Sequence, residues 1–517
     1  MNWGHLPYTW VGDWSRRRAS LSPDRTAICD RSEGQTYTYA DVDARATKTA
    51  RLLEAVGVDT DDRVAVLSRN RIELFDLFFA TAKRGSILAP LSPRLTPPEV
   101  SQLLELVDPR LLVVESPTVD LAERAITTAD VDPKLLEVGS DQRTSTYERV
   151  SEAIPDECSP VESVERSLGD PHLLLHTGGS TGVPKETVLT HGSIYWNAFN
   201  TITAWGLRPD DITPLVFPLF HTGGWNVLTL AIISLGGTLC LEREVDPGRI
   251  LETIEEEGAT VLVAVPTVLG QLARHDRWEE TDLSTLRFVK SGGGPCRETI
   301  IDAWRERNVE FSQGYGLTEC GPNNFAMPDV FPDEATASVG KPVLHTDVRI
   351  VDEDGTTLET DEIGELELAG PHAAAGYWGD TADDTFDGKW VSTGDLARRD
   401  TAGYYHIEGR KTNMFTSGGE NVYPPEIENA IADHPAVEDV IVIGVPDDQW
   451  GTVGKAVIEP TSSADTADPL TIDDLEAHLR GRLARFKIPR SLEFVDALPT
   501  SGPSKLDREA VERQYGE

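Results

Sequence analysis

The segment from residue 177 to residue 185 contains the residue types that bind a phosphate group. Three glycines allow positive φ and close approach of the backbone, while three hydroxyls, free N–H groups and a lysine can meet an anion. A glycine- and serine-rich surface turn has a similar composition, so the loop alone leaves both interpretations open. The residues that we expect to bind phosphate are Thr177, Gly178, Gly179, Ser180, Thr181, Gly182 and Lys185.

The spacing differs from that of a P-loop NTPase. That motif requires Gly-x-x-x-x-Gly-Lys-Ser/Thr at the start of a helix. Here Pro184 precedes Lys185, and a second strand-like run follows at Thr187–Thr190. The spacing therefore argues against a P-loop NTPase.

Strands and helices alternate around this loop. The apolar run Pro171–His176 is typical of a buried strand that leads into the loop. Alternation over the first 106 residues predicts a mainly parallel sheet covered by helices on both faces, which is an α/β fold. From Glu115 to Asp170 the pattern weakens, and we interpret this part as a variable acidic excursion. The predicted strands are 35–39, 63–67, 87–90 and 286–290, and the predicted helices begin near 41 and span 73–82, 96–106 and 192–205.

Length and charge restrict the classes of protein. A chain of 517 residues is too long for one core and should divide into at least two domains. The net charge is −40, with 87 Asp and Glu against 47 Lys and Arg. Nucleic acid and anionic membranes are therefore poor partners, because both require a basic surface. The carboxylates are spread along the chain and lysine is scarce, which favours a solvated acidic surface adapted to concentrated salt.

The cysteines and the apolar runs point to the cytoplasm. Five scattered cysteines form neither a disulfide framework nor a metal-spaced cluster. Residues 1–18 have no continuous apolar core, so they do not form a signal peptide. The longest apolar run, Leu228–Leu241, is too short to span a bilayer. We expect a cytoplasmic protein without an integral membrane segment, and the sequence leaves open whether it forms a homodimer.

The sequence Thr-Gly-Gly-Ser-Thr-Gly-Val-Pro-Lys at 177–185 closely resembles the phosphate loop of the adenylate-forming superfamily. This superfamily contains acyl- and aryl-CoA synthetases, luciferases and the adenylation domains of peptide synthetases. Further motifs follow in the family's order, and the resemblance covers almost the whole chain. These further motifs include Phe220-His221-Thr222-Gly223-Gly224, Ser291-Gly292-Gly293-Gly294, Gly314-Tyr315-Gly316-Leu317-Thr318-Glu319 and Ser392-Thr393-Gly394-Asp395.

The resemblance implies roles for these residues in a site for ATP and an acid. His221, Trp225 and Gly293 would line the acyl pocket, with His221 at the carboxylate end. Gly292, Gly293 and Gly294 would form a wall of the adenine and acyl sites, and Tyr315 would stack on adenine. Thr318 would bind the α-phosphate, while Glu319 and Thr177 would bind Mg²⁺, which prefers oxygen ligands. Asp395 would accept from the ribose hydroxyls and Arg410 would close the ribose from the other side.

The C-terminal part resembles the family's small mobile domain. The resemblance implies a large N-terminal adenylation domain at 1–410 and a small α+β domain at 411–517. The hinge would lie at Thr412, and Gly418 and Gly419 would admit the pantetheine arm of coenzyme A. Lys505 would stabilise the transition state of acyl-AMP formation. Four residues depart from the family pattern: Glu186 replaces a glycine, Ser504 replaces a glycine, and Thr412 and Asn413 replace charged hinge residues.

These motifs predict an AMP-forming acid–thiol ligase with ATP, Mg²⁺ and coenzyme A as cofactors. The carboxylate of the acid attacks the α-phosphorus of ATP, pyrophosphate leaves, and coenzyme A then takes the acyl group. No general base is needed, because the carboxylate is already ionised at pH 7. Adenylation for a carrier protein, a luciferase-like reaction and a non-catalytic ligand-binding relative stay as alternatives.

The acyl motif favours an apolar acid. The stretch from Phe220 to Val227 contains no charged residue for a second polar group on the substrate, and it resembles the fatty-acyl branch of the family. We expect a medium- to long-chain fatty acid, with an aryl acid as the alternative because Trp225 could cap the tunnel.

Overall fold

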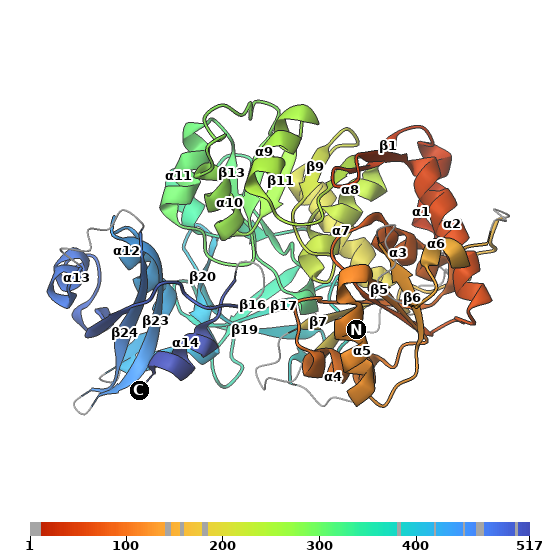
Figure 1. Ribbon diagram of the computed structural model, residues 1–517. Coiled ribbons are helices and arrows are strands. Elements are labelled where there is room, and N and C mark those ends of the chain that lie inside the picture. The colour runs from red at the N-terminus through yellow and green to blue at the C-terminus, as the bar shows by residue number, and fades with distance from the viewer. Residues whose placement is uncertain are drawn as a thin grey trace.

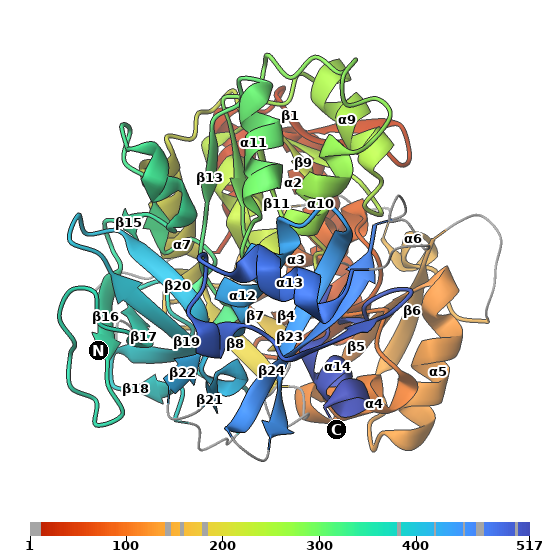
Figure 2. The same ribbon diagram turned by 90° about the vertical axis from the view of Figure 1, so that its left-hand side faces the viewer.

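The chain forms a large N-terminal body and a smaller C-terminal part that lies against one side of it (Figures 1 and 2). The computed structural model describes residues 12–139, 146–155, 160–177, 185–379, 384–417, 420–447, 450–461, 470–501 and 505–516. Within the part described, no helix is long and apolar enough to cross a membrane.

The first sheet of the body has six strands in the order β6-β5-β3-β4-β7-β8. All neighbours are parallel except β7 and β8, which form an antiparallel hairpin on either side of the predicted phosphate loop. Two cores lie on opposite faces of this sheet, one under α2 and α3 and the other under α4 and α5. The sheet elements are β3 (Arg63–Leu67), β4 (Ile87–Leu91), β5 (Leu111–Glu115), β6 (Lys134–Val138), β7 (Pro171–Thr177) and β8 (Lys185–Thr190), and the helices are α2 (Tyr39–Ala55), α3 (Ile72–Arg84), α4 (Pro97–Val107) and α5 (Val119–Thr128).

The α/β prediction is therefore confirmed, and its helices bury the predicted faces. In α2 the side chains of Val42, Ala46, Ala50 and Leu53 are all buried, as their helical spacing requires. Thr38 and Asp41 form a reciprocal capping box that fixes the start of α2.

We interpreted the segment from 115 to 170 as a variable excursion, but the structure shows that it is part of the first sheet and its covering layer. It contributes the edge strand β6 and the covering helix α5 to the first sheet, together with α6 (Val150–Ala153). The buried side chains of α5 are few and small, Val119, Ala122 and Ala125.

A second layer of the body contains two further sheets. One has the order β2-β1-β10-β9, and the other is a parallel sheet with the order β11-β12-β13. Helices α9, α10 and α11 cover the second of these around a separate core (Figure 1). The elements are α1 (Trp14–Leu21), β1 (Thr26–Asp30), β2 (Gln35–Thr38), α7 (His191–Trp205), β9 (Ile212–Leu215), α8 (Thr229–Leu235), β10 (Thr238–Leu241), α9 (Pro247–Glu256), β11 (Val261–Ala264), α10 (Pro266–Ala273), β12 (Phe288–Ser291), α11 (Glu298–Glu306) and β13 (Phe311–Gln313).

A largely antiparallel sheet connects the body to the C-terminal part. Its order is β16-β17-β19-β18, with β20 paired to β19. The strands are β16 (Asp347–Val351), β17 (Gly364–Ala369), β18 (Phe386–Asp387), β19 (Trp390–Arg399) and β20 (Tyr405–Arg410), preceded by the short strands β14 (Phe325–Ala326) and β15 (Lys341–Pro342).

The C-terminal part has its own sheets and its own core, in which α12 and α13 pack on β23 and β24. This α+β composition matches the prediction for the small domain, and the boundary at 410/411 stays a prediction. The elements are β21 (Phe415–Ser417), β22 (Glu420–Val422), α12 (Pro424–Ala432), β23 (Val437–Asp447), β24 (Gly451–Pro460), α13 (Ile472–Leu479), β25 (Ser491–Phe494), β26 (Thr500–Ser501), β27 (Lys505–Leu506) and α14 (Arg508–Tyr515).

Two arginines of the body hold the C-terminal part by ion pairs. Arg274 Nη1 lies 2.6 Å from Glu438 Oε1. Arg297 pairs with Asp439 and also donates to the carbonyl oxygen of Glu438 at 2.5 Å. These contacts join the ends of α10 and α11 to β23.

Candidate active site

Two glycine-containing loops leave the carboxyl ends of the neighbouring parallel strands β12 and β13. The N–H of Gly314 donates to the carbonyl oxygen of Ser291 at 2.7 Å, which holds the two loops together. A Cβ atom added at Gly292 or Gly294 would meet no described atom within 4 Å, and Gly293 has a φ of +86°. Ligands of parallel sheets bind at the carboxyl ends of the strands, so this open space suits the predicted adenine wall.

Three predicted nucleotide-binding residues are in direct contact. The hydroxyl of Tyr315 donates to Asp395 Oδ2 at 2.5 Å, and Arg410 Nε lies 2.8 Å from Asp395 Oδ1. Burial and then the neighbouring Asp395 raise the pKa of Tyr315 well above its ordinary value, so its hydroxyl stays a donor. Tyr315 lies on the loop after β13, Asp395 on β19 and Arg410 on β20. The fold thus brings together residues that are up to 95 positions apart in the sequence.

A second set of contacts connects the predicted metal ligand to the phosphate loop. Glu319 lies on a single 3₁₀ turn, Thr318–Cys320, and accepts a hydrogen bond from the hydroxyl of Tyr377 at 3.0 Å. Lys185 Nζ lies 4.7 Å from the centre of the Tyr377 ring. Tyr377 was absent from the predicted site, although its position in the Gly-Tyr-Trp motif at 376–378 was a signal.

Glu319 fits a magnesium ion that is shared with a substrate. No group of three or more His, Cys, Asp or Glu side chains that could hold a metal ion occurs among the described residues. Mg²⁺ characteristically uses one or two carboxylates and completes its shell with phosphate oxygens and water. Glu319 would supply the carboxylate, and the ion would neutralise phosphate charge.

Several predicted binding residues cannot be placed. Gly178, Gly179, Ser180, Thr181, Gly182, Gly418, Gly419 and Ser504 lie outside the described residues. Thr177 ends β7 opposite Lys185 on β8, so the two flanks of the phosphate loop are side by side. The metal-binding role of Thr177 stays a prediction.

The acyl motif begins beside this hairpin. His221 is partly exposed and lies near the N-terminal end of a single π-helical turn, Gly223–Val227. Its ring centre is 5.9 Å from that of His176, the penultimate residue of β7. The acyl and phosphate motifs are therefore adjacent in space.

Trp225, which we expected to line the acyl pocket, is packed among core side chains in this structure, and its role in substrate binding stays a prediction. Its side chain is 0% exposed, and its indole Nε1 donates to the carbonyl oxygen of Leu219 at 2.5 Å. The ring stacks on Phe78 at 4.7 Å and lies 5.5 Å from Phe75, both on α3. The indole is thus part of the main core, because the π-helical turn directs it toward α3.

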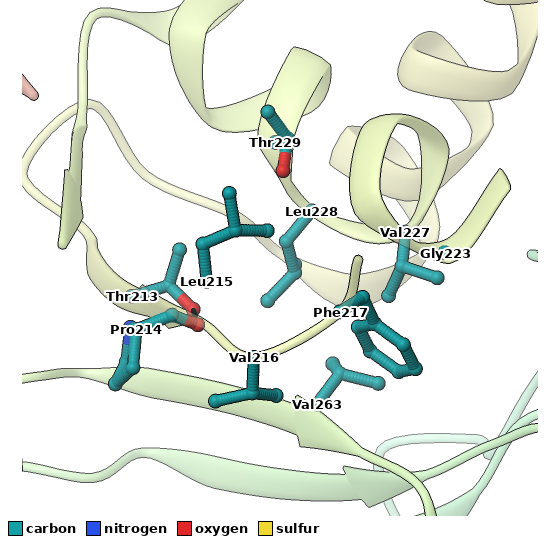
Figure 3. Close-up of a pocket in the computed structure, with 10 residues that line it drawn as sticks. All are labelled: Thr213, Pro214, Leu215, Val216, Phe217, Gly223, Val227, Leu228, Thr229 and Val263. Atoms are coloured by element: carbon teal, nitrogen blue, oxygen red, sulfur yellow. Dashed lines mark hydrogen bonds between the residues drawn. The ribbon is translucent and has the colours of Figure 1, made fainter. Parts of the chain in front are cut away.

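A small apolar cavity lies beside the π-helical turn, which contributes Gly223 and Val227 to its lining (Figure 3). Its volume is about 10 Å³, and Trp225 is not among the lining residues. Thr213 and Thr229 provide the only polar side chains of the lining. The lining residues are Thr213, Pro214, Leu215, Val216, Phe217, Gly223, Val227, Leu228, Thr229 and Val263.

Lys290 is a buried cation on the strand next to Val263, a residue of the cavity lining, and it was not among the predicted site residues. It pairs in register with Val263 of β11, so both side chains project from the same face of the sheet. Lys290 Nζ donates to Ser312 Oγ at 2.6 Å and lies 5.2 Å from the Trp205 ring centre. Burial lowers the pKa of Lys290 to about 8. Only the position of Lys290 directly before the glycine motif could have indicated a role.

The C-terminal candidates are placed only in part. Thr412 lies in the exposed 3₁₀ turn Lys411–Asn413, directly after Arg410 and β20, as expected for a hinge. Lys411 Nζ pairs with Glu365 of the body at 2.8 Å. The backbone of Lys505 lies in the β26–β27 hairpin, and its catalytic role stays a prediction, as do those of Thr318 and His221.

Comparisons with known proteins agree with these motifs. The family described as "AMP-binding enzyme" matches residues 15–378, and the family described as "AMP-binding enzyme C-terminal domain" matches residues 426–505. The chain is 37% identical to a feruloyl-CoA synthase of Amycolatopsis sp. over 98% of the chain and 99% of the relative. It is 34% identical to an indoleacetate–CoA ligase of Aromatoleum aromaticum over 97% of each chain. It is 32% identical to the long-chain-fatty-acid–CoA ligase FadD13 of Mycobacterium tuberculosis over 98% of this chain.

Solved structures show the same fold. The anthranilate CoA ligase AuaEII in complex with anthranoyl-AMP has a TM-score of 0.92 at 27% identity, covering 100% of this chain and 99% of that chain. ATP-bound MatB from Rhodopseudomonas palustris has a TM-score of 0.87, and apo MatB one of 0.77, each at 28% identity and covering 98% and 99% of the two chains. The chain therefore belongs to the AMP-binding, adenylate-forming enzyme family and is an AMP-forming acid–CoA ligase.

Proposed function

We propose that the acid is an aryl or arylalkyl carboxylic acid that carries a polar group on its ring. The observation that supports this most is Lys290, a buried amine on the strand next to Val263, which lines the small apolar cavity. A buried polar group favours a ligand that can pair with it and disfavours one that cannot. A ring hydroxyl, methoxy oxygen or ring nitrogen would accept a further hydrogen bond from the Lys290 amine, which already donates to Ser312, whereas an alkyl chain would accept none.

The relatives support the same choice. Feruloyl-CoA synthase and indoleacetate–CoA ligase are named for aryl acids and share 37% and 34% of their residues with this chain. The fatty acid favoured by the acyl motif is the second candidate. It is supported by the 32% identity with FadD13 and by the predominantly apolar lining of the cavity.

On the nucleotide side, different residues would bind the nucleoside and the phosphates in the first half-reaction. Tyr315, Asp395 and Arg410 would hold the nucleoside, while Lys185, Thr318 and Glu319 with its Mg²⁺ would hold the phosphates. An anionic transition state forms at the α-phosphorus, so the residues act by positioning and charge stabilisation. Lys505 would add positive charge at that centre.

The arrangement of the two parts supports an assignment to this first step. The same relative, MatB, gives a higher TM-score in its ATP-bound form than in its apo form, 0.87 against 0.77. The ion pairs of Arg274 and Arg297 with β23 would hold this arrangement. Thioester formation would then require these pairs to break, so that the segment around Gly418 and Gly419 can approach the site.

Competition among acids tests the substrate class. Hydroxycinnamic, arylacetic and benzoic acids would be mixed in equal amounts with medium- and long-chain fatty acids, ATP, Mg²⁺ and coenzyme A in high salt. Mass spectrometry of the CoA thioesters should show that ring-substituted acids dominate. The variant Lys290→Met should lower kcat/KM for a hydroxylated ring about tenfold relative to the unsubstituted ring, as the loss of one buried hydrogen bond predicts. Dominance of fatty acyl-CoA, with no effect of Lys290→Met on the ratio, would favour the second candidate.

A further inference from the structure

Glu186 is a fully buried acid at the start of β8, directly after the phosphate loop. Its side chain is 0% exposed, and neither carboxyl oxygen has a hydrogen-bond partner in the part of the chain that the structure describes. An unpaired carboxylate is very costly to bury, so the group retains its proton instead. Burial alone raises the pKa of Glu186 to about 8. At neutral pH the carboxyl is therefore a hydrogen-bond donor.

His176 lies directly opposite Glu186 in the β7–β8 hairpin. Side chains that face each other across antiparallel strands project from the same face, with Cβ atoms about 4.5–5.5 Å apart. Neither ring nitrogen of His176 has a hydrogen-bond partner of normal geometry among the described residues. A neutral imidazole has one ring nitrogen that can accept a hydrogen bond.

His176 also contacts the acyl motif. Its ring centre lies 5.9 Å from that of His221 and 6.3 Å from that of Phe220. The hairpin that carries the phosphate loop therefore reaches the predicted carboxylate end of the acyl site through this one ring. The two reactants of acyl-AMP formation, the α-phosphate and the carboxylate, would meet between these elements.

We propose that Glu186 is a positioning residue for acyl-AMP formation: its neutral carboxyl donates a hydrogen bond to His176 across the hairpin and so holds the His176 ring against His221. This role rests on the proposed function. The facing strand positions put the two side chains within reach of each other, and the bond would give the Glu186 carboxyl a partner that it otherwise lacks among the described residues. The proton stays on Glu186, and no covalent bond changes.

The titratable groups around Glu186 do not change its pKa, so its charge state is determined by burial. The segment beside β8 contributes Tyr377, and Trp378 donates its N–H to the carbonyl oxygen of Glu186 at 2.7 Å. On α4, Glu99 accepts from Thr96 at its own helix start, and Glu105 is exposed. None of these groups shifts the pKa of Glu186. As the pH rises through about 8, the carboxyl loses its proton and can no longer donate.

The pH dependence of the first half-reaction tests the proposal. Acid-dependent exchange of pyrophosphate into ATP would be measured from pH 6.5 to 9.5 for the wild type, Glu186→Gln and Glu186→Leu. At pH 7, Leu should lower kcat about tenfold, as expected for one lost hydrogen bond, with little change in KM for ATP. Gln retains an N–H donor and should rescue most of this loss. Above pH 8 the wild type should decline, whereas Glu186→Gln should not.

A double-variant cycle and a stability measurement complete the test. In a His176→Leu background, Glu186→Gln and Glu186→Leu should have equal kcat, and persistent differences would overturn the pairing. The raised pKa of Glu186 makes its stability contribution fall as the pH rises from its ordinary value of 4.5 to about 8. The melting temperature of Glu186→Gln should therefore exceed that of the wild type by more at pH 9 than at pH 5.

The outcomes separate this proposal from the proposed function. If no acid supports exchange in any variant, the proposed function fails, while the melting curves still report whether Glu186 is a buried neutral acid. If exchange occurs but the wild type and Glu186→Gln have coincident pH profiles, the positioning role is wrong. Equal melting differences at pH 5 and pH 9 would also contradict it.

Discussion

The nucleotide side and the acyl side of the candidate site are held together by different interactions. On the nucleotide side, hydrogen bonds and an ion pair connect Tyr315 with Asp395 and Arg410, and Glu319 with Tyr377. On the acyl side the main contacts are between rings and apolar side chains, and the cavity has only two polar side chains in its lining.

This difference between the two sides explains why short sequence motifs identify the nucleotide side more readily than the acyl side. ATP presents the same polar groups to every enzyme that binds it, so each group requires a particular residue type at a particular position. The shape of the acyl side depends instead on the combined volumes of side chains from β9, the π-helical turn and β11. We therefore expect changes on the nucleotide side to affect turnover, and changes on the acyl side to affect stability or selectivity.

The largest effect is expected from Trp225→Ala, as a loss of stability. Removing a fully buried aromatic ring between Phe78 and Leu219 leaves a cavity and should cost about 3–5 kcal/mol of unfolding free energy. Denaturant melts of the wild type and the variant would measure it. A stable variant whose preference shifts to longer acids would contradict the core assignment and restore Trp225 to the pocket wall.

The next largest effect is expected from Asp395→Ala, which acts on the nucleotide side. The change removes the acceptor of Tyr315 and the ion-pair partner of Arg410, so kcat/KM for ATP should fall roughly 10- to 100-fold, as for lost hydrogen bonds to a charged group. KM for the acid should change little. As a control, Asp347→Ala removes a carboxylate that pairs with Lys389 at the surface and should leave both parameters near those of the wild type.

An equal rise in KM for ATP and for the acid after Asp395→Ala would contradict the distinction between the nucleotide side and the acyl side. Asp395 would then stabilise the whole site rather than its nucleotide side.

Salt should give the smallest effect. With a net charge of −40, the chain repels itself at low ionic strength, and molar KCl shortens the screening length to about 3 Å. The melting temperature and the activity should therefore rise from dilute buffer to molar KCl. Circular dichroism melts at several KCl concentrations would show this, and a flat or falling series would refute the salt adaptation.

Particular residues show what the sequence could and could not predict. The spacing of Val42, Ala46, Ala50 and Leu53 identified the buried face of α2, because an apolar stripe must recur with the helical period. The contact between Tyr315, Asp395 and Arg410 followed from motif order and not from any physical pattern in the sequence. Lys290 was missed because its role depends on a neighbour in another strand, Val263.

The environments of two further residues could be identified only from the fold. The packing of Trp225 on α3 could not be predicted, because a sequence does not show the direction in which a π-helical turn points its ring. Glu186 was recognised as a departure from the family pattern, but its lack of a partner became visible only once the hairpin placed it opposite His176.

The two half-reactions of Lys505→Ala test most directly whether the chain is a ligase that works through acyl-AMP. Pyrophosphate release with ATP and an accepted acid would report the first step, and CoA thioester formation from supplied acyl-AMP would report the second. The change should slow the first step by at least about 10²-fold, as for the loss of one group that stabilises a transition-state charge, and leave the second step near the wild-type rate. Equal loss of both steps, or no loss of either, would contradict the two-step account.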